Sequence, residues 1–211
     1  KIYHQPLPVA KQTKLLGMVR SYTPELGLVT AWPIDLVYRQ SGGAPIGFIM
    51  PETRGYEPIH KLYSPTDRKK YFGAVDWQFL IVAARNAAAS VATVHAAGAV
   101  IGDINFNSFM VAQDATVKLI DCDSFQIRID GDTHLCLVGT DEFTPPELQG
   151  KSFAKTLRTP NHDAFGLAVT VFRLLMMGRH PYAGVYSGPG DMPLARAIQE
   201  GRYAYGAQAS S

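Results

Sequence analysis

The chain has 211 residues, of which 46% are hydrophobic and 18% are charged, and its net charge at pH 7 is +2. This length and apolar content suffice for one large domain, or for two small lobes, around a buried core. A net charge so close to zero gives no electrostatic argument for a nucleic-acid partner, which typically binds a strongly basic surface.

The cysteines and the apolar stretches indicate a cytoplasmic protein. Cys122 and Cys136 have neither C-x-x-C nor metal-ligand spacing, so two reduced thiols are favoured over a disulfide. The first residues lack the apolar segment of a signal peptide. Residues 165–177 form the most apolar stretch, but they are fewer than the ~20 residues that cross a bilayer and they include Arg173. We therefore expect a buried helix there.

The front of the chain predicts strands and one short helix. In chain order they are the end of a strand at 1–3, an amphipathic helix at 11–21, and strands at 29–38 and 46–50. Thr23-Pro24 is expected to limit the helix, because the residue before a proline avoids helical geometry. Ser41-Gly42-Gly43 predicts the turn between the two strands. Residues 51–67, rich in proline and polar types, predict a connector.

The rest of the chain predicts a mostly helical body. Its elements are a helix at 76–97, strands at 109–111 and 117–120, a loop at 131–146, a helix at 163–177 and a short helix at 193–200. Asp163 is the candidate N-cap of the second long helix, and Gly178 follows its end. The outline is a two-lobed α+β fold with a hairpin at the junction, and such folds bind ligands between the lobes.

Two aspartates flank this hairpin. Asp103 lies in a polar loop after the first long helix, and Asp121 follows the strand at 117–120. Each could be an ordinary turn residue, since aspartate favours turns. The ends of one hairpin, however, can direct both carboxylates into one cleft. Phosphoryl transfer needs that arrangement, because one carboxylate orients the attacking hydroxyl and the other holds a metal ion on the phosphates.

Residues 94–123 resemble the catalytic and metal-binding loops of the protein-kinase superfamily. Ile101-Gly102-Asp103 stands in the place of the H-R-D motif, and Asp121-Cys122-Asp123 stands in the place of D-F-G. The other similar motifs, in chain order, are Gly139-Thr140 for G-T, Thr144-Pro145-Pro146-Glu147 for A-P-E, and residues 163–182 for the central helix of the larger lobe and its G-x-x-P-F end. Motifs in this order make the resemblance specific over nearly the whole chain.

The resemblance implies a fold and a division of the chain. The fold is a two-lobed protein-kinase-like α+β fold, with residues 1–53 as a truncated N-lobe of antiparallel sheet with its hinge, and residues 54–211 as a mostly helical C-lobe. No glycine-rich phosphate loop precedes Lys1, and the final helices of the larger lobe barely begin, so we expect a domain that is incomplete at both ends.

The resemblance also implies an activity, which is transfer of the γ-phosphoryl group of ATP to Ser or Thr hydroxyls of a protein, with Mg²⁺ or Mn²⁺. Asp103 and Asn105 would be catalytic. Asp121 would hold the metal ion together with Asn107 or Ser108, which are equally good candidates. The residues expected to contact the nucleotide are Lys1, Met50, Pro51, Glu52, Thr53, Met110 and Asp121.

Sequence segments such as residues 120–127 resemble those of a divergent bacterial branch of the superfamily. That branch includes kinases associated with tellurite-resistance operons and with phosphatases, some of them fused to helix-hairpin-helix segments. It implies a protein substrate and a phosphatase from the same operon as partners, with no sign of nucleic acid or membrane in this chain.

Several positions depart from the kinase pattern. Gly102 replaces an arginine that usually grips a phosphorylated activation loop, and Asn105 replaces a lysine near the transferred phosphate. Asp123 replaces a glycine and is expected to add a carboxylate near the metal. The predicted helix at 11–21 contains no acid, so Gln12 is the nearest substitute for the glutamate that pairs with the strand lysine. These departures keep open an alternative, a pseudokinase that binds nucleotide as a scaffold or switch.

Overall fold

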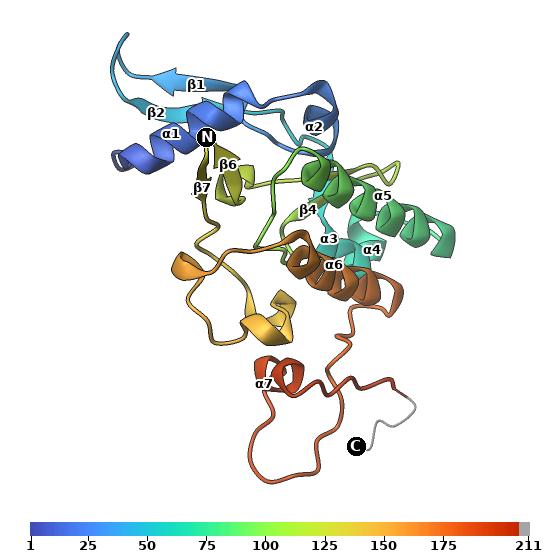
Figure 1. Ribbon diagram of the computed structural model, residues 1–211. Coiled ribbons are helices and arrows are strands. Elements are labelled where there is room, and N and C mark those ends of the chain that lie inside the picture. The colour runs from blue at the N-terminus through green and yellow to red at the C-terminus, as the bar shows by residue number, and fades with distance from the viewer. Residues whose placement is uncertain (207–211) are drawn as a thin grey trace.

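The computed structural model describes residues 1–206, which form an α+β structure. Figure 1 shows α1 (Val9–Arg20), β1 (Asp35–Tyr38) and β2 (Pro45–Ile49) at one end of the molecule. The long helices α5 (Trp77–Ala96) and α6 (Pro160–Leu175) pack side by side in the other part. The predicted fold class, a small strand-rich front joined to a mostly helical body, is confirmed.

The front sheet is an antiparallel pair of β1 and β2, in which Asp35 is opposite Ile49. The first three residues lie along β2, since Phe48 N–H donates to Lys1 O at 3.0 Å and Tyr3 N–H donates to Ile46 O at 2.9 Å. This pairing confirms the predicted strand end. It also fixes Lys1 beside the sheet, which matters for the site described below.

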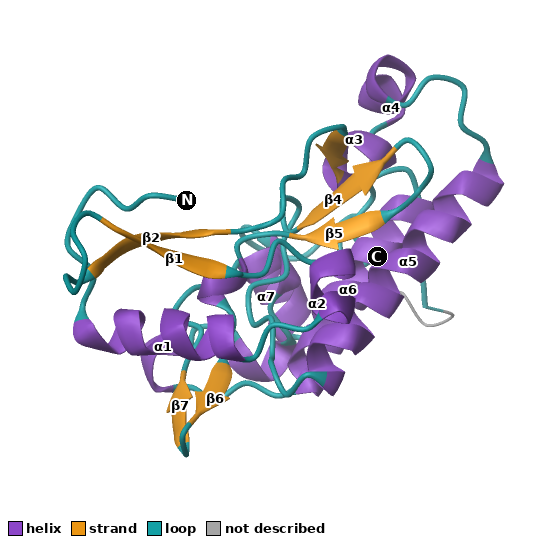
Figure 2. Ribbon diagram, turned by 90° about the horizontal axis from the view of Figure 1, so that it is seen from above, coloured by secondary structure: helices purple, strands orange, loops and turns teal. Residues whose placement is uncertain are grey.

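Helix α1 packs under this sheet through its buried face, where Leu15 and Met18 are fully buried. Trp32 Nε1–H donates to Met18 O at 2.7 Å and ties the helix end to the segment before β1. Figure 2 shows α1 lying between the β1–β2 pair and a second hairpin, β6 (Ile127–Ile129) and β7 (Asp132–His134). The helix is therefore held from both sides.

The predicted strand at 29–38 was wrong at its beginning. The chain forms helix α2 (Pro24–Val29), runs extended to residue 34, and only then enters β1. Thr23 Oγ1 accepts a hydrogen bond from Leu26 N–H at 3.3 Å, and Pro24 occupies the first helical position. The Thr-Pro pair that ends one helix also begins the next, because proline is preorganised for the first turn.

The predicted connector at 51–67 was also wrong in its second half. It contains β3 (Tyr56–Pro58), α3 (Ile59–Tyr63) and the start of α4 (Pro65–Tyr71). Strand β3 pairs with β4 (Phe109–Ala112), which pairs with β5 (Val117–Leu119), so the predicted hairpin is the larger part of a three-stranded antiparallel sheet. The proline and polar residues of this segment favour a loop prediction, but pairing of β3 with β4 stabilises a strand there.

Helix α5 has the bounds expected from its spacing, and Asp76 caps it by accepting from Phe79 N–H at 2.9 Å. Among the described residues it is the one helix long and apolar enough to cross a membrane. Leu80, Ala83 and Val94 of this helix are buried in the same core cluster as Phe109 of β4. These contacts favour a core helix.

Asp163 is not the N-cap of α6, contrary to prediction. The helix begins three residues earlier at Pro160, and His162 Nδ1 accepts from Thr159 N–H at 3.0 Å. Asp163 is instead 2% exposed in the first turn. Thr159-Pro160 begins this helix as Thr23-Pro24 begins α2, and Asp163 makes a buried contact instead of a cap.

The segment predicted as loop at 131–146 begins with strand β7, paired with β6. It continues through the 3-10 turns η2 (Asp141–Phe143) and η3 (Pro146–Leu148), and η4 (Phe153–Lys155) follows. Helix α7 (Leu194–Gln199) matches the predicted short helix within a residue. Cys122 and Cys136 are both free and buried, as expected for reduced thiols.

Lys14 of α1 is 5% exposed, and burial together with nearby Lys11 lowers its pKa to about 8. We expect Lys14→Met to stabilise the protein at pH 7 by on the order of 3 kcal/mol. Because the folded pKa is below the unfolded value, wild-type stability rises between pH 8 and 10.5, and the difference between the two proteins should shrink there. Urea unfolding at several pH values, with exposed Lys69→Met as control, measures it. A difference that grows with pH contradicts the assignment.

Candidate active site

One cavity brings most of the predicted site residues together. It has a volume of about 250 Å³, and its walls come from the first residue, the loop at 103–108, the segment at 120–125 and Val138. Its lining residues are Lys1, Asp103, Asn105, Asn107, Ser108, Ile120, Asp121, Asp123, Ser124, Phe125 and Val138. Asp103 and Asp121, separate in sequence, therefore face the same space.

Asp103 is positioned by a network within its own loop and by the segment around Thr140. Thr140 Oγ1–H donates to Asp103 Oδ1 at 3.0 Å, while Oδ2 accepts no hydrogen bond from any residue of 1–206. Ser108 Oγ–H donates to Asp103 O at 2.9 Å, and Asn105 Nδ2–H donates to the same carbonyl at 3.3 Å. A carboxylate fixed through one oxygen can accept a hydroxyl proton with the other.

The loop that carries Asp103 is anchored to α6. The buried carboxylate of Asp163 accepts from Ile101 N–H at 2.7 Å and from Gly102 N–H at 2.8 Å. His95 Nε2–H donates to the same carboxylate at 2.8 Å, which gives this histidine a structural role. The buried carboxylate accepts hydrogen bonds from two backbone amides of the loop and so fixes the position of the loop relative to α6.

Asp121 follows β5 in the left-handed region, with φ of 56°, a conformation that aspartate and asparagine tolerate better than most residues. Its side chain is 71% exposed to the cavity and solvent, and Lys1 Nζ lies 3.2 Å from Oδ1. The turn thus directs a largely free carboxylate outward, where a cation could approach.

Asp123 is the centre of a cluster of cations. Its carboxylate accepts from Lys1 Nζ at 2.8 Å, from Lys11 Nζ at 2.8 Å and from Tyr3 Oη–H at 2.6 Å, and its side chain is 6% exposed. Burial alone would raise its pKa, but Lys11, Lys1 and Tyr3 outweigh burial and lower the pKa to about 2. The carboxylate is therefore ionised throughout the physiological range.

Lys1 is held by the same cluster. Burial favours the neutral amine, but hydrogen bonding and charge from Asp123, with those from Asp121, raise the pKa of its ammonium above the ordinary value. Tyr3 has its pKa raised by burial and by its bond to Asp123, so it remains a hydrogen-bond donor. Lys1 is a fixed positive charge at the wall of the cavity.

Gln12, the nearest substitute in helix α1 for a glutamate, does not pair with Lys1, and the acid is supplied differently. Gln12 does not face Lys1, because Gln12 Nε2–H donates to Leu7 O at 2.7 Å. Asp123 supplies the acid, and helix α1 contributes a second lysine, Lys11, in place of an acid. Nor does Asp123 add a free carboxylate for a metal, since its oxygens are occupied. Two features of the sequence together could have suggested that Asp123 pairs with Lys1. The helix at 11–21 contains no acid, and Asp121-Cys122-Asp123 contains an additional one.

Asn105, Asn107 and Ser108 all line the cavity, but they are not equally free. Ser108 Oγ accepts from Asn105 N–H at 2.9 Å as well as donating to Asp103 O, so its hydroxyl belongs to the loop. Asn105 Oδ1 accepts from Asn107 N–H at 2.9 Å. The Asn107 side chain is exposed and forms no hydrogen bond with other residues of the part of the chain that the structure describes.

The predicted nucleotide-base contacts lie outside the lining of this cavity. Met50, Pro51, Glu52 and Thr53 form the link from β2 to β3, where Glu52 pairs with Arg54 at 3.1 Å. The link leads into β3, and Met110 lies on the neighbouring strand β4, opposite Pro58 of β3. The link and Met110 therefore border the same sheet, and their contact with a nucleotide stays a prediction.

The side chains of this cavity could hold a cation that a substrate also ligates, which differs from a metal site built from protein ligands alone. Among residues 1–206 no group of three or more His, Cys, Asp or Glu side chains could hold a metal ion. Mg²⁺ is commonly bound by one or two carboxylates together with substrate phosphates and water, and exposed Asp121 with an amide oxygen suits that mode. Lys1 adds the positive charge that phosphates require.

Known proteins are similar to this chain in sequence and in fold. The chain is 50% identical over 208 residues, 97% of its length, to the protein kinase YegI of Escherichia coli O157:H7 and of Escherichia coli strain K12. It spans 32% of the length of these relatives. No family model matches the chain. Among solved structures, the ROP18 kinase domain in complex with AMP-PNP and sucrose aligns with a TM-score of 0.56 at 18% identity, covering 84% of this chain and 54% of that one.

Proposed function

This chain is related to the protein-kinase superfamily in sequence and in fold, and on that premise we propose that it transfers the γ-phosphoryl group of ATP to Ser or Thr hydroxyls of a protein. The observation that carries the proposal is the shared cavity of Asp103, Asp121 and Lys1. A base, a metal ligand and a phosphate-binding cation in one space are the parts that phosphoryl transfer uses.

Asp103 acts on the acceptor in this proposal. Thr140 holds Oδ1, and Oδ2 accepts the proton of the attacking hydroxyl. Asn105 supports the loop through its bond to the Asp103 carbonyl. The catalytic contribution of the chain is then largely orientation of the acceptor against the phosphate.

Asp121 and Asn107 are the proposed ligands of Mg²⁺, with Ser108 as a structural neighbour of the site. The ion would supply charge neutralisation at the transferred phosphate, and Mn²⁺ has similar ligand preferences. Lys1 contacts phosphate oxygens, and the link at 50–53 with Met110 borders the base. Support for a nucleotide comes from the solved kinase domain of similar fold, which is in complex with AMP-PNP.

Incubation of the intact protein with labelled ATP and Mg²⁺ tests the proposal. The acceptors are peptide libraries in which Ser, Thr or Tyr is the one hydroxyl residue. We expect label on Ser and Thr peptides and stabilisation of the protein by ATP·Mg²⁺. Label on Tyr peptides alone contradicts the acceptor class, and absence of transfer together with absence of nucleotide binding contradicts the function.

A nucleotide-binding pseudokinase is the second candidate, favoured by one observation. Both polar groups of Asn105 are engaged within its loop, so this position, where a lysine is usual, offers no positive charge to the transferred phosphate. Thermal stabilisation by ATP·Mg²⁺ without any phosphorylated product would favour this scaffold role.

The remaining expectations stay predictions. They are a protein substrate with a phosphatase from the same operon as partner, a cytoplasmic location, the divergent bacterial branch and a boundary between lobes at residue 53. Because the chain spans about a third of its curated relatives, the activity and partners of the whole protein are included among these proposals.

A further inference from the structure

Arg158 is a buried cation without a carboxylate partner. It lies just before α6, is 3% exposed, and takes part in none of the ion pairs formed by residues 1–206. Its guanidinium instead donates from Nη1 to Gly102 O and from Nη2 to Val138 O at 2.6 Å. Nη1 also donates to Cys136 Sγ at 3.7 Å. A buried charge is costly unless well hydrogen-bonded, so the two carbonyls, with this sulfur, hold the guanidinium.

Both chain segments that Arg158 contacts position Asp103, one by preceding it in sequence and the other by a hydrogen bond to its carboxylate. Gly102 directly precedes Asp103, so its carbonyl belongs to the peptide that sets the direction of that side chain. Val138 lies two residues before Thr140, whose hydroxyl bonds Asp103 Oδ1 at 3.0 Å. One guanidinium therefore couples the loop that carries the proposed base to the segment that orients it.

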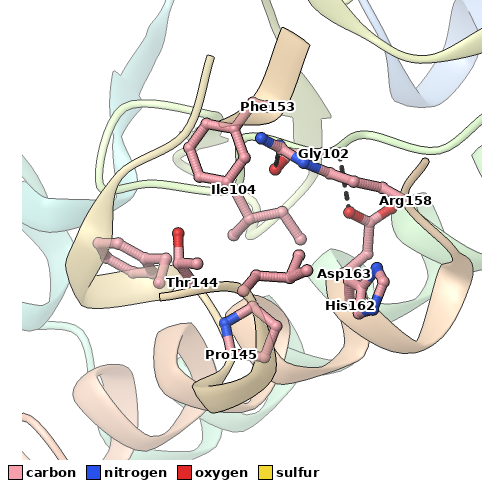
Figure 3. A pocket seen from close by; sticks show the side chains of 10 residues that line it. Gly102, Ile104, Thr144, Pro145, Phe153, Arg158, His162 and Asp163 are labelled. Atoms are coloured by element: carbon pink, nitrogen blue, oxygen red, sulfur yellow. Dashed lines mark hydrogen bonds between the residues drawn. The ribbon is translucent and has the colours of Figure 1, made fainter. Parts of the chain in front are cut away.

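The guanidinium is itself fixed on two sides. The Phe153 ring lies under it, with the ring centroid 3.9 Å from Arg158 Cζ, and Figure 3 shows the side chain running beside this ring toward Gly102. Gln126 pairs with the backbone of Arg158, accepting from its N–H at 2.8 Å and donating to its carbonyl at 2.7 Å. These contacts hold the Arg158 guanidinium in one position within the fold.

Gly102 leaves the space that Arg158 occupies. It has φ of 77°, and a Cβ there would lie 2.7 Å from Cys136 Cβ and 2.9 Å from Arg158 Nη1. A side chain at residue 102 would strain the backbone and displace the guanidinium. The glycine before Asp103 and the arginine before α6 therefore belong to one arrangement.

We propose that Arg158 is a positioning residue that holds the segment 136–141 on the Asp103 loop without any phosphate group on that segment. Its two amino groups are already used by carbonyls, and its Nε is buried and unpartnered, so little of the guanidinium is available to grip a phosphorylated side chain. The proposal rests on the proposed phosphoryl transfer for its kinetic consequence, but its structural consequence is independent of activity.

Hydrogen exchange on the intact protein tests the structural part. In Arg158→Met, amides at 136–141 should exchange on the order of tenfold faster or more, while α5 amides stay unchanged. Gly102→Ala should reproduce the effect, and exposed Arg128→Met is the matched control without it. Phosphatase treatment of the wild type should leave the exchange of 136–141 unchanged. Unchanged exchange in Arg158→Met, or faster exchange after phosphatase treatment alone, overturns the proposal.

Kinetics separate positioning from general support of the fold. We expect kcat of Arg158→Ala to fall on the order of 100-fold with KM for ATP within about threefold, since a small misplacement of the reacting groups has that effect. Added guanidinium, unlike sodium at equal ionic strength, should restore part of kcat. An equal loss in Arg128→Ala, or no rescue with a large rise in KM, contradicts positioning. A wild type without transfer refutes the proposed function, and the exchange experiment still decides the role of Arg158.

Discussion

Asp121→Asn should lower kcat/KM for phosphate transfer from ATP by on the order of 10³-fold or more, because removal of the carboxylate charge weakens a metal ion that is worth several kcal/mol to the transition state. Asparagine is the suitable replacement, since residue 121 has φ of 56° and asparagine also adopts this conformation. Transfer of labelled phosphate measures the effect, and a Mg²⁺ titration should show a higher requirement for the ion.

The control for this prediction is Asp191→Asn, which removes a carboxylate from an exposed residue outside the cavity. Its activity should stay at the wild-type level, and the thermal stability of both variants should be similar to wild type because the Asp121 side chain is 71% exposed. Undiminished transfer in Asp121→Asn would remove Asp121 from the metal site.

Asp123→Asn should reduce both stability and activity. The buried carboxylate binds Lys1, Lys11 and Tyr3, so its neutralisation leaves Lys11 without an acid partner and leaves Lys1 with Asp121 alone. We expect the free energy of unfolding to fall by about 2–4 kcal/mol, toward the lower side of buried pairs because both lysines are partly exposed and can regain water. Lys1 would lose its fixed position, so KM for ATP should rise as well.

Urea unfolding and ATP titration of Asp123→Asn measure the two effects, with Asp130→Asn as the control. Asp130 is an exposed residue of the β6–β7 hairpin with φ of 50°, which asparagine also accommodates. If Asp123→Asn is as stable as Asp130→Asn, the cluster contributes nothing to the fold. If stability falls but KM for ATP stays constant, Asp123 does not position Lys1 for the nucleotide.

The same carboxylate predicts an acid limit to stability. Its pKa is lowered to about 2 from the ordinary 3.8, so its contribution is fully present above about pH 4 and is lost as the pH falls toward 2. The linked free energy is on the order of 2 kcal/mol. The stability difference between wild type and Asp123→Asn should therefore narrow over that range.

The sequence by itself determined the long helices, the hairpin between the two aspartates and the placement of Asp103 and Asp121 in one cavity. Helix α5 follows from apolar spacing with Asp76 as its cap, and both depend on local geometry alone. Asp103 and Asp121 could be placed together because one short hairpin separates them, and a hairpin brings its ends close wherever it lies in a fold.

Only the tertiary structure decided which charges meet. The exchange of Gln12 for Asp123 and Lys11 depends on how α1 lies against the loop after β5, and no local pattern encodes that packing. Asp163 has the sequence context of a cap but serves as a buried acceptor, since α6 starts earlier at Thr159-Pro160. Arg158 reads as an ordinary surface arginine until the fold brings Gly102 and Val138 to it. The physical reason is common to all three: hydrogen bonds between residues remote in sequence are set by the relative position of whole elements, which periodicity within one element does not specify.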